Sequence, residues 1–314
     1  MGRCLSCHKP IPELEEGYHI RCARRLFDAK WVPDIPFSST DIVTQAAKMI
    51  GKISISGVQP KLSVHLDKKE KVLAVVETGG HFILKPQVEQ FRNLPENENL
   101  CMNIAEDLGI ETPPHGLLRF QDGRFCYVIR RFDRVKDGSK LHQEDFQQLT
   151  GIEDKYAGSA EKMGNALLSF SNAPLLDAVI LFERLLLFFV VGNGDAHLKN
   201  FSMLKRPELG YRLSPVYDVV NSRLVLPSET EEMSLSINGK RNRLKREDFI
   251  SFAGYMEIAD RAVSVVFDRI ENKKKAITAE VESSFLPKKM KAGFREIFEE
   301  RWSRLFKRNI MHDP

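Results

Sequence analysis

The sequence predicts an α+β protein with a sheet-rich first lobe, a helix-rich second lobe and a small cysteine-rich segment before them. Short β-branched runs bounded by turn residues fill much of residues 52–132, and apolar residues at helical spacing dominate after residue 141. Three of the five cysteines lie within the first 22 residues. We therefore expect three parts, residues 1–30, 31–133 and 134–314, with the prolines and serines of residues 31–41 as a linker.

The first lobe is expected to be mainly sheet with one helix. The helix is predicted at residues 95–109, because Leu100, Ile104 and Leu108 share one face and Gly109 is a stop signal. The expected strands are short apolar runs at residues 52–57, 61–66, 71–77, 81–86, 115–120 and 124–132.

The second lobe is expected to be mostly helical, with one strand-like pair at residues 201–205 and 211–216. A sheet-rich lobe followed by a helical one suggests a binding cleft between them. The helices are predicted at residues 141–151, 161–170, 174–191, 245–256, 259–273 and 288–307.

Charge gives little support for a nucleic-acid partner. The chain has 314 residues, 42% of them hydrophobic, which is enough for an ordinary core, and its net charge is only +4. The lysine runs at residues 271–276 and 288–291 are typical of solvated helix faces. The alternative, that the basic C-terminal helices bind nucleic acid directly, depends on charge alone.

No export signal or membrane span is expected. The N-terminus has no apolar core of a signal peptide, and the most apolar stretch, residues 175–192, contains Asp177, Glu183 and Arg184. That stretch is predicted to be a buried helix. With an odd number of cysteines, we expect a cytoplasmic protein whose thiols are free or bound to metal.

A polar cluster after the buried helix is the first candidate for chemistry. Asp195 and Asn200 have the D-x-x-x-x-N spacing of a kinase catalytic loop, and Asp218 in the next turn supplies a second carboxylate. The alternative is a helix C-cap at Gly192 and Asn193 followed by a polar loop, which does not explain Asp218. The pattern therefore favours phosphoryl transfer, with Asp195 as base and Asn200 and Asp218 as magnesium ligands.

Lys85 lies in an apolar strand, where burying an unpaired ammonium would be costly. A phosphate or a carboxylate partner is expected, and Glu98 on the following helix is a candidate by analogy with the kinase lysine–glutamate pair. Alternatively, Lys85 ends its strand and reaches solvent. Residues 54–61 contain one glycine, so read alone they indicate an ordinary hairpin.

Six motifs in order resemble the HipA toxin family of serine/threonine kinases, and in particular its short HipT-like members. They are SISGVQPK, FILKP, VIRRFDR, LHQEDFQQ, NGDAHLKN and PVYD, and the resemblance covers residues 50–310. It implies a two-lobed protein-kinase-like fold that uses ATP and Mg²⁺.

The resemblance also implies site residues. Asp195 would be the catalytic base, assisted by Lys85, and Asn200 and Asp218 would bind magnesium. The implied nucleotide contacts are Ser56, Gly57, Val58, Gln59, Lys61, Lys85, His197, Lys199, Asn200, Tyr217 and Asp218, with Arg130, Arg131 and Phe132 as the hinge against adenine.

The biological role is implied by the same resemblance. Family members phosphorylate aminoacyl-tRNA synthetases and are restrained by a helix-turn-helix antitoxin. They also autophosphorylate a serine at the start of the phosphate-covering loop, which corresponds to Ser54 here, with Ser56 as a second acceptor. The resemblance also implies that the chain begins near the catalytic portion, without the small subdomain that precedes it in long members, so a separate small protein is expected as a second partner. The alternative is a nucleotide-binding regulatory protein, switched by phosphate on Ser54 and Ser56 and without protein substrates.

The N-terminal segment is a candidate zinc module. Cys4 and Cys7 form C-x-x-C, and eleven residues later His19 and Cys22 form H-x-x-C, which suits a tetrahedral Zn²⁺ site. His8 is an alternative ligand, and three unliganded cysteines in a flexible tail are the alternative to a metal site. Cys101 and Cys126 lie in apolar patterns and are expected in the core.

Overall fold

The computed structural model describes residues 2–12, 17–41, 59–135 and 138–307. The chain divides into two compact units, which are described separately. The first unit comprises Met1–Ile104, Thr112–Leu141 and Ala279–Leu286. The second unit comprises Ala105–Glu111, His142–Thr278 and Pro287–Pro314.

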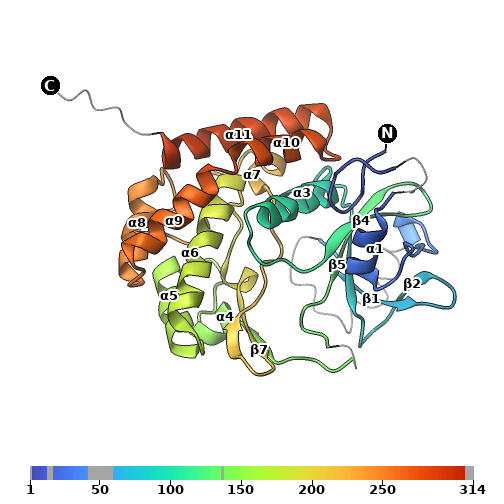
Figure 1. The fold of residues 1–314 in the computed structure, drawn as a ribbon, viewed down its shortest axis with the longest axis horizontal. Coiled ribbons are helices and arrows are strands. Elements are labelled where there is room, and N and C mark those ends of the chain that lie inside the picture. The colour runs from blue at the N-terminus through green and yellow to red at the C-terminus, as the bar shows by residue number, and fades with distance from the viewer. Residues whose placement is uncertain (1, 13–16, 42–58, 136–137, 308–314) are drawn as a thin grey trace. The chain divides into compact units, whose positions relative to one another are not determined.

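The first unit is built on a five-stranded antiparallel sheet in the order β2-β1-β3-β5-β4 (Figure 1). Its strands are β1 (Leu62–Asp67), β2 (Val72–Val75), β3 (Phe82–Pro86), β4 (His115–Arg119) and β5 (Phe125–Arg130). All five are predicted by the sequence. The further strand expected at residues 52–57 lies outside the described residues. β3 is the middle strand, and Lys85 pairs there with Tyr127 of β5.

The N-terminal segment packs onto this sheet. Helix α1 (Ile20–Phe27), which the sequence analysis does not predict, contacts β5 and buries one face (Figure 1). Its buried residues Leu26 and Phe27 belong to one hydrophobic cluster with Cys4, Leu62 and Leu84. The cysteine-rich segment and the sheet therefore share a core.

The helix predicted after β3 is present as α3 (Leu94–Asp107). Leu100, Ile104 and Leu108 are fully buried, as their helical spacing predicts. Gly109 follows the helix in the left-handed region, at φ 76°, where glycine is favoured. The predicted stop is therefore confirmed.

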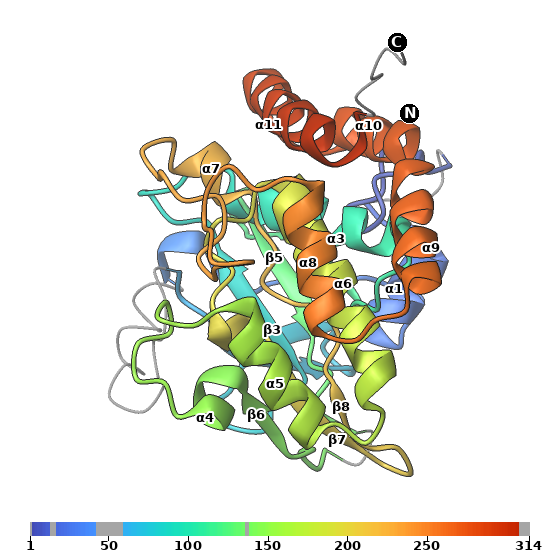
Figure 2. The same cartoon turned by 90° about the vertical axis from the view of Figure 1, so that its left-hand side faces the viewer.

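The second unit is organised around α6 (Pro174–Val191), the helix predicted to be buried (Figure 2). At least four of the described helices contact it, and it supplies a continuous run of buried side chains from Leu185 to Val191. The contacting helices are α5 (Ala160–Phe170), α8 (Arg246–Tyr255), α9 (Asp260–Glu271) and α11 (Lys288–Phe306). The same unit contains the short helices α4 (Phe146–Thr150) and α7 (Ser222–Val225).

A three-stranded antiparallel sheet of the second unit has the order β6-β7-β8. β7 (Ser202–Arg206) and β8 (Gly210–Leu213) are the predicted strand pair. β6 (Gln143–Asp145) lies where the sequence analysis predicts the start of a helix. The side chain of Asp145 accepts a hydrogen bond from the Gln148 backbone N–H, so this N-cap delays the helix to Phe146.

Helix α10 (Lys274–Ser283) is not predicted by the sequence analysis, which notes only the lysine run at residues 271–276 that overlaps its first turn. Ile277 and Val281 are buried, four residues apart, and this narrow stripe is the apolar signal of the helix. Among the residues that the structure describes, no helix is long and apolar enough to cross a membrane.

Candidate functional site

A buried ion pair joins β3 and α3 in the first unit. The Lys85 ammonium donates to the Glu98 carboxylate over 2.5 Å, and the two side chains are 4% and 1% exposed. The same ammonium lies over the ring of Tyr127, and its Nζ is 5.5 Å from the ring centroid. Lys85 therefore does not end its strand in solvent, and the carboxylate partner expected from the kinase analogy is present.

The end of β5 has its own charged pair. The Arg131 guanidinium donates two hydrogen bonds, of 2.8 and 2.7 Å, to the buried carboxylate of Asp133. Burial opposes ionisation of Asp133, yet these bonds prevail and its pKa is lowered. The backbone N–H of Arg131 donates to His81, which fixes the chain leaving the strand. Arg130 and Phe132, the other expected hinge residues, are half-buried.

The expected phosphate-covering loop is only partly described. Ser54, Ser56, Gly57 and Val58 lie outside the described residues. Gln59 donates from its side-chain amide to the carbonyl oxygen of Pro86 over 2.7 Å. Lys61 directly precedes β1 and is exposed. The hydrogen bond from Gln59 attaches the C-terminal end of the loop to Pro86, the residue after Lys85.

In the second unit, Gly192 and Gly194 connect α6 to the polar cluster, and neither position has room for a side chain. Gly192 ends the helix at φ 76°, and a Cβ there would lie 2.9 Å from Asn221 Oδ1 and from Ile297 Cγ2. A Cβ on Gly194 would lie 3.0 Å from the carbonyl oxygen of Glu231. The chain can therefore turn into Asp195 only with small residues at both positions.

Asp195 is exposed and accepts a hydrogen bond of 2.8 Å from the phenol of Tyr156. The ring of Tyr156 also packs edge-on against His197. Burial raises the pKa of Tyr156, and its hydrogen bond to Asp195 adds to the effect, so the phenol remains a donor. The carboxylate of Asp195, the expected base, therefore already accepts a hydrogen bond from a hydroxyl group.

The neighbouring histidine, His197, is buried beside a lysine. His197 is 8% exposed, and its Nε2 lies 2.8 Å from the ammonium of Lys155. Burial lowers the pKa of His197 and Lys155 lowers it further, against the opposing charge of Asp195. The backbone N–H of His197 donates to Asn200 Oδ1 over 3.0 Å, which orients the amide of a candidate magnesium ligand.

The loop from Asp195 to Asn200 is joined to the turn that contains Asp218. The phenol of Tyr217 donates to the carbonyl oxygen of Lys199 over 2.9 Å. Burial raises the pKa of Tyr217, so it stays protonated as a donor. Asp218 follows at φ 57°, a left-handed conformation that aspartate tolerates better than most residues and that is common at functional sites.

Residues that the sequence analysis missed brace this loop. Ser222 accepts a hydrogen bond from the Gly194 backbone N–H and donates to Glu229, over 2.8 and 3.0 Å. Ser234 donates to the carbonyl oxygen of Ala196. Ser222, Ser234, Lys155 and Tyr156 lie 28 to 42 positions in sequence from the loop residues that they contact, and no short motif contains them.

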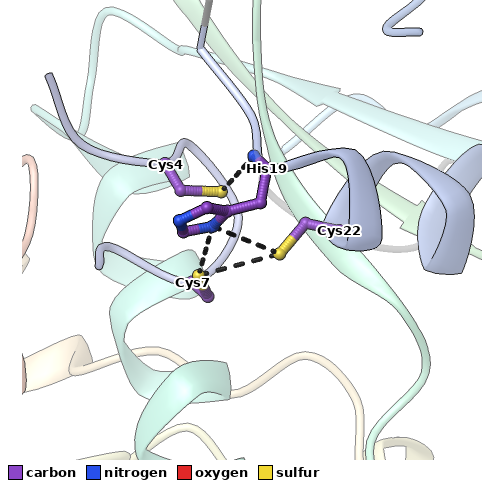
Figure 3. Close-up of side chains that lie close together, drawn as sticks. All are labelled: Cys4, Cys7, His19 and Cys22. Atoms are coloured by element: carbon purple, nitrogen blue, oxygen red, sulfur yellow. Dashed lines mark hydrogen bonds between the residues drawn. The ribbon is translucent and has the colours of Figure 1, made fainter. Parts of the chain in front are cut away.

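The four predicted zinc ligands form a cluster in the first unit (Figure 3). The ligand atoms of Cys4, Cys7, His19 and Cys22 all lie within 4.8 Å of one another. Hydrogen bonds from Cys22 and Cys7 lower the pKa of the Cys4 thiol, which favours a thiolate, the metal-binding form of cysteine. His8, the alternative ligand, is absent from this cluster; its ring is buried against α3.

The structure thus gathers the expected residues into three groups. Lys85 and Glu98 form one in the first unit, and the Cys/His cluster forms another there. Asp195, His197, Lys199, Asn200, Tyr217 and Asp218 lie on two connected segments of the second unit. Cys101 and Cys126 are fully buried, as predicted.

Comparisons with known proteins point to one family. Residues 53–283 match the profile described as HipA-like C-terminal domain. Over its whole length the chain is 27% identical to a Haemophilus influenzae protein named "Putative kinase", of which the alignment covers 99%. It is also 26% identical to the "Serine/threonine-protein kinase toxin HipA" of Shewanella oneidensis, over 54% of this chain and 43% of that protein.

A solved structure supports the same fold. A chain of the Shewanella oneidensis HipA, HipB and operator DNA complex superposes with a TM-score of 0.69 at 20% identity, covering 86% of this chain and 71% of that chain. At this identity the likeness concerns the fold, so the predicted α+β, protein-kinase-like fold is confirmed.

Proposed function

Because the chain belongs to the HipA-like C-terminal domain family, we propose that it is an ATP- and magnesium-dependent serine/threonine protein kinase, the toxin of a toxin–antitoxin system. The observation that carries the proposal is the buried Lys85–Glu98 pair, at 2.5 Å. A strand lysine paired with a helix glutamate is the arrangement that positions nucleotide phosphates in active protein kinases. The kinase names of the relatives support the same reading.

In the proposed mechanism, Asp195 accepts the proton of a serine or threonine hydroxyl as the oxygen attacks the γ-phosphate. The carboxylate is exposed, so an acceptor hydroxyl can reach it by displacing the phenol of Tyr156, from which it accepts a hydrogen bond in this structure. The buried ring of His197 and the fixed turn at Gly192 keep the loop in place beside the base.

Asn200 and Asp218 are the proposed magnesium ligands. Both supply the oxygen atoms that Mg²⁺ prefers, and Asn200 Oδ1 has a second lone pair after accepting from His197. When bound, magnesium neutralises the charge that develops on the phosphates. Lys85, Gln59, Lys61, His197, Lys199 and Tyr217 are the proposed phosphate or nucleotide contacts, with Arg130, Arg131 and Phe132 toward adenine.

The guanidinium of Arg131 is paired with the Asp133 carboxylate and does not point to a nucleotide contact. We propose that its backbone, which is fixed by the bond to His81, forms the hinge instead of its side chain.

The wider role is part of the same proposal. The name of the Shewanella relative and the HipA, HipB and DNA complex support a helix-turn-helix antitoxin as partner of this cytoplasmic toxin. An aminoacyl-tRNA synthetase is the proposed substrate, and a separate small protein is a proposed further partner. Ser54 and Ser56 are the proposed autophosphorylation sites, where a phosphate would repel the nucleotide phosphates.

The test is intact mass and peptide mapping of unmodified protein after incubation with Mg²⁺ and ATP, alone and with a panel of purified synthetases. Asp195→Asn should abolish transfer, whereas Glu296→Gln, which removes an exposed carboxylate from α11, should not change it. Phosphate on a synthetase, or on Ser54 or Ser56, only when Asp195 is intact would support the proposal. Equal transfer by wild type and Asp195→Asn would refute the assignment of the base.

If nucleotide binds but no phosphate is transferred to any protein, the regulatory alternative replaces the kinase. Replacing Asp218 by Asn separates the roles further. It keeps a side chain that tolerates the left-handed conformation but removes a charge, so we expect lost transfer and a higher magnesium requirement for nucleotide binding.

A further inference from the structure

We propose that Cys4, Cys7, His19 and Cys22 bind one structural zinc ion, and that this ion fixes the segment that positions helix α3 and its Glu98. The second half of this inference rests on the proposed function, since it concerns the Lys85–Glu98 pair. The first half does not.

The separations within the cluster fit tetrahedral zinc. Zinc–sulfur bonds near 2.3 Å and zinc–nitrogen bonds near 2.0 Å place neighbouring ligand atoms roughly 3.5–3.8 Å apart. Cys7 Sγ lies 3.7 Å from Cys22 Sγ and 3.4 Å from His19 Nδ1, and Cys22 Sγ lies 3.8 Å from that nitrogen (Figure 3). All five cysteines of the chain are free thiols, so no disulfide competes for these sulfurs.

The imidazole of His19 is oriented for coordination. Its Nε2 lies 2.9 Å from the carbonyl oxygen of Pro10, which can only accept, so the proton is on Nε2. Nδ1 then presents its lone pair to the three sulfurs. A backbone carbonyl on the distal nitrogen is the usual partner of a zinc-bound histidine. In addition, the His19 backbone N–H points to Cys4 Sγ at 3.5 Å, as expected beside a thiolate.

Four protein ligands leave no open position, so the site is structural. The residues between and after its first two cysteines make the contacts that give it a role. Ser6 donates to the carbonyl oxygen of His115 on β4 over 2.8 Å and accepts, through its own carbonyl, from Asn103 of α3 over 2.9 Å. The backbone N–H of Leu117 donates to Leu5, which continues the attachment to β4.

His8 completes the connection to α3. Its ring is fully buried, its Nε2 lies 2.7 Å from the amide nitrogen of Asn99, and its Nδ1 lies 2.8 Å from the Glu280 carboxylate. Asn99 and Asn103 are one helical turn apart, so two consecutive turns of α3 are bound by the Cys4–His8 segment. Glu98 directly precedes Asn99. Movement of the segment would therefore move the carboxylate away from Lys85.

The segment is a turn closed by its own backbone hydrogen bonds, from the Cys4 N–H to Lys9 and from the His8 N–H to Cys4. The four ligand atoms lie within 4.8 Å of one another, a spacing that one bound cation would hold. Zinc binding would add a constraint to this turn, because a bound ion connects the segment to the start of α1 through His19 and Cys22.

Metal content is the first test. Full-length protein purified under reducing conditions should contain one zinc ion per chain by mass spectrometry of its metals, and Co²⁺ exchanged into the site should give tetrahedral thiolate absorption bands. Cys22→Ser and His19→Ala should lose both signals. Cys126→Ala, which removes a buried thiol outside the cluster, should keep them. Wild type without zinc, even after incubation with Zn²⁺ alone, would overturn the site.

The connection to α3 is tested on wild-type protein, since ligand variants can fail to fold. Removing zinc with a chelator should increase amide hydrogen exchange in residues 94–107 and leave residues 246–255 of α8 unchanged; re-adding Zn²⁺ should reverse it. Unchanged exchange in α3 would overturn this half while leaving the metal site standing.

A thermodynamic cycle then separates this inference from the proposed kinase function. Zinc removal should weaken binding of a non-hydrolysable ATP analogue several-fold in wild type and much less in Glu98→Gln, because the pair is already broken there. Equal losses in both proteins would show that zinc does not act through Glu98. No nucleotide binding by zinc-loaded wild type would refute the proposed function, and the exchange experiment would still decide the structural role.

Discussion

The phenol of Tyr156 donates a hydrogen bond of 2.8 Å to the carboxylate of Asp195. The two residues are 39 positions apart, and the contact places an aromatic hydroxyl where the proposed mechanism requires the hydroxyl of a substrate. The pKa of Tyr156 is raised, so the phenol acts as a donor across the physiological range and not as a competing base.

Replacing this tyrosine should favour the acceptor protein. Tyr156→Phe keeps the ring against His197 but removes the donor, so a substrate hydroxyl no longer has to displace it. We expect the KM for the protein acceptor to fall about threefold, at the low end of the range for one hydrogen bond, with kcat unchanged. Steady-state kinetics would measure this, and Tyr255→Phe is the control, since its phenol is bonded to Asn165. A lower kcat would instead make Tyr156 a positioning residue for Asp195.

Breaking the Lys85–Glu98 pair should cost stability as well as activity. Lys85→Met deprives a 1% exposed carboxylate of its ammonium, which should lower the free energy of unfolding by about 3–5 kcal/mol. Adding Glu98→Leu should restore most of it, because replacing both charges by apolar groups is often neutral. Denaturant unfolding would measure both. Activity should be absent in each variant, and a stable but inactive double variant would separate the two roles.

The turn before the catalytic loop should tolerate no side chain. Gly192→Ala would place a Cβ in the left-handed region, at about 1–2 kcal/mol, and within 2.9 Å of Asn221 and Ile297. We expect loss of transfer together with lower stability in thermal unfolding. Gly254→Ala is the matched control, because that glycine lies within α8 with no atom within 4 Å of its Cβ position. The control should be slightly stabilising, by about 0.5–1 kcal/mol.

The Arg131–Asp133 pair should make stability depend on acid. The folded pKa of Asp133 is lowered, so its contribution is fully present above the unfolded value, about 3.9, and is lost as pH falls through the lower folded value. Asp133→Asn should therefore destabilise the protein by about 2 kcal/mol at pH 7. The difference between variant and wild type should shrink below about pH 4, measured by denaturant unfolding at a series of pH values. A difference that does not change with pH would contradict the ionic origin.

The sequence by itself determined the features that depend on neighbours along the chain. Helical spacing predicts α3 and the buried α6, alternating apolar runs predict the strands of the first sheet, and short fixed spacings predict both the Asp195–Asn200 loop and the Cys/His cluster. These signals are local, since backbone geometry alone brings such residues to one face or one turn.

Tertiary structure decided the contacts between segments far apart in the sequence. Tyr156 contacts Asp195, Asn99 binds His8 across 91 positions, and Ser222 binds Gly194, although Tyr156, Asn99 and Ser222 belong to no recognisable motif. The sequence predicts a helix over the residues that form β6. In the structure, pairing with β7 and the Asp145 cap prevail over the local helix propensity. The reason is physical: propensity and spacing constrain a few consecutive residues, whereas these partners are selected only when the whole core packs.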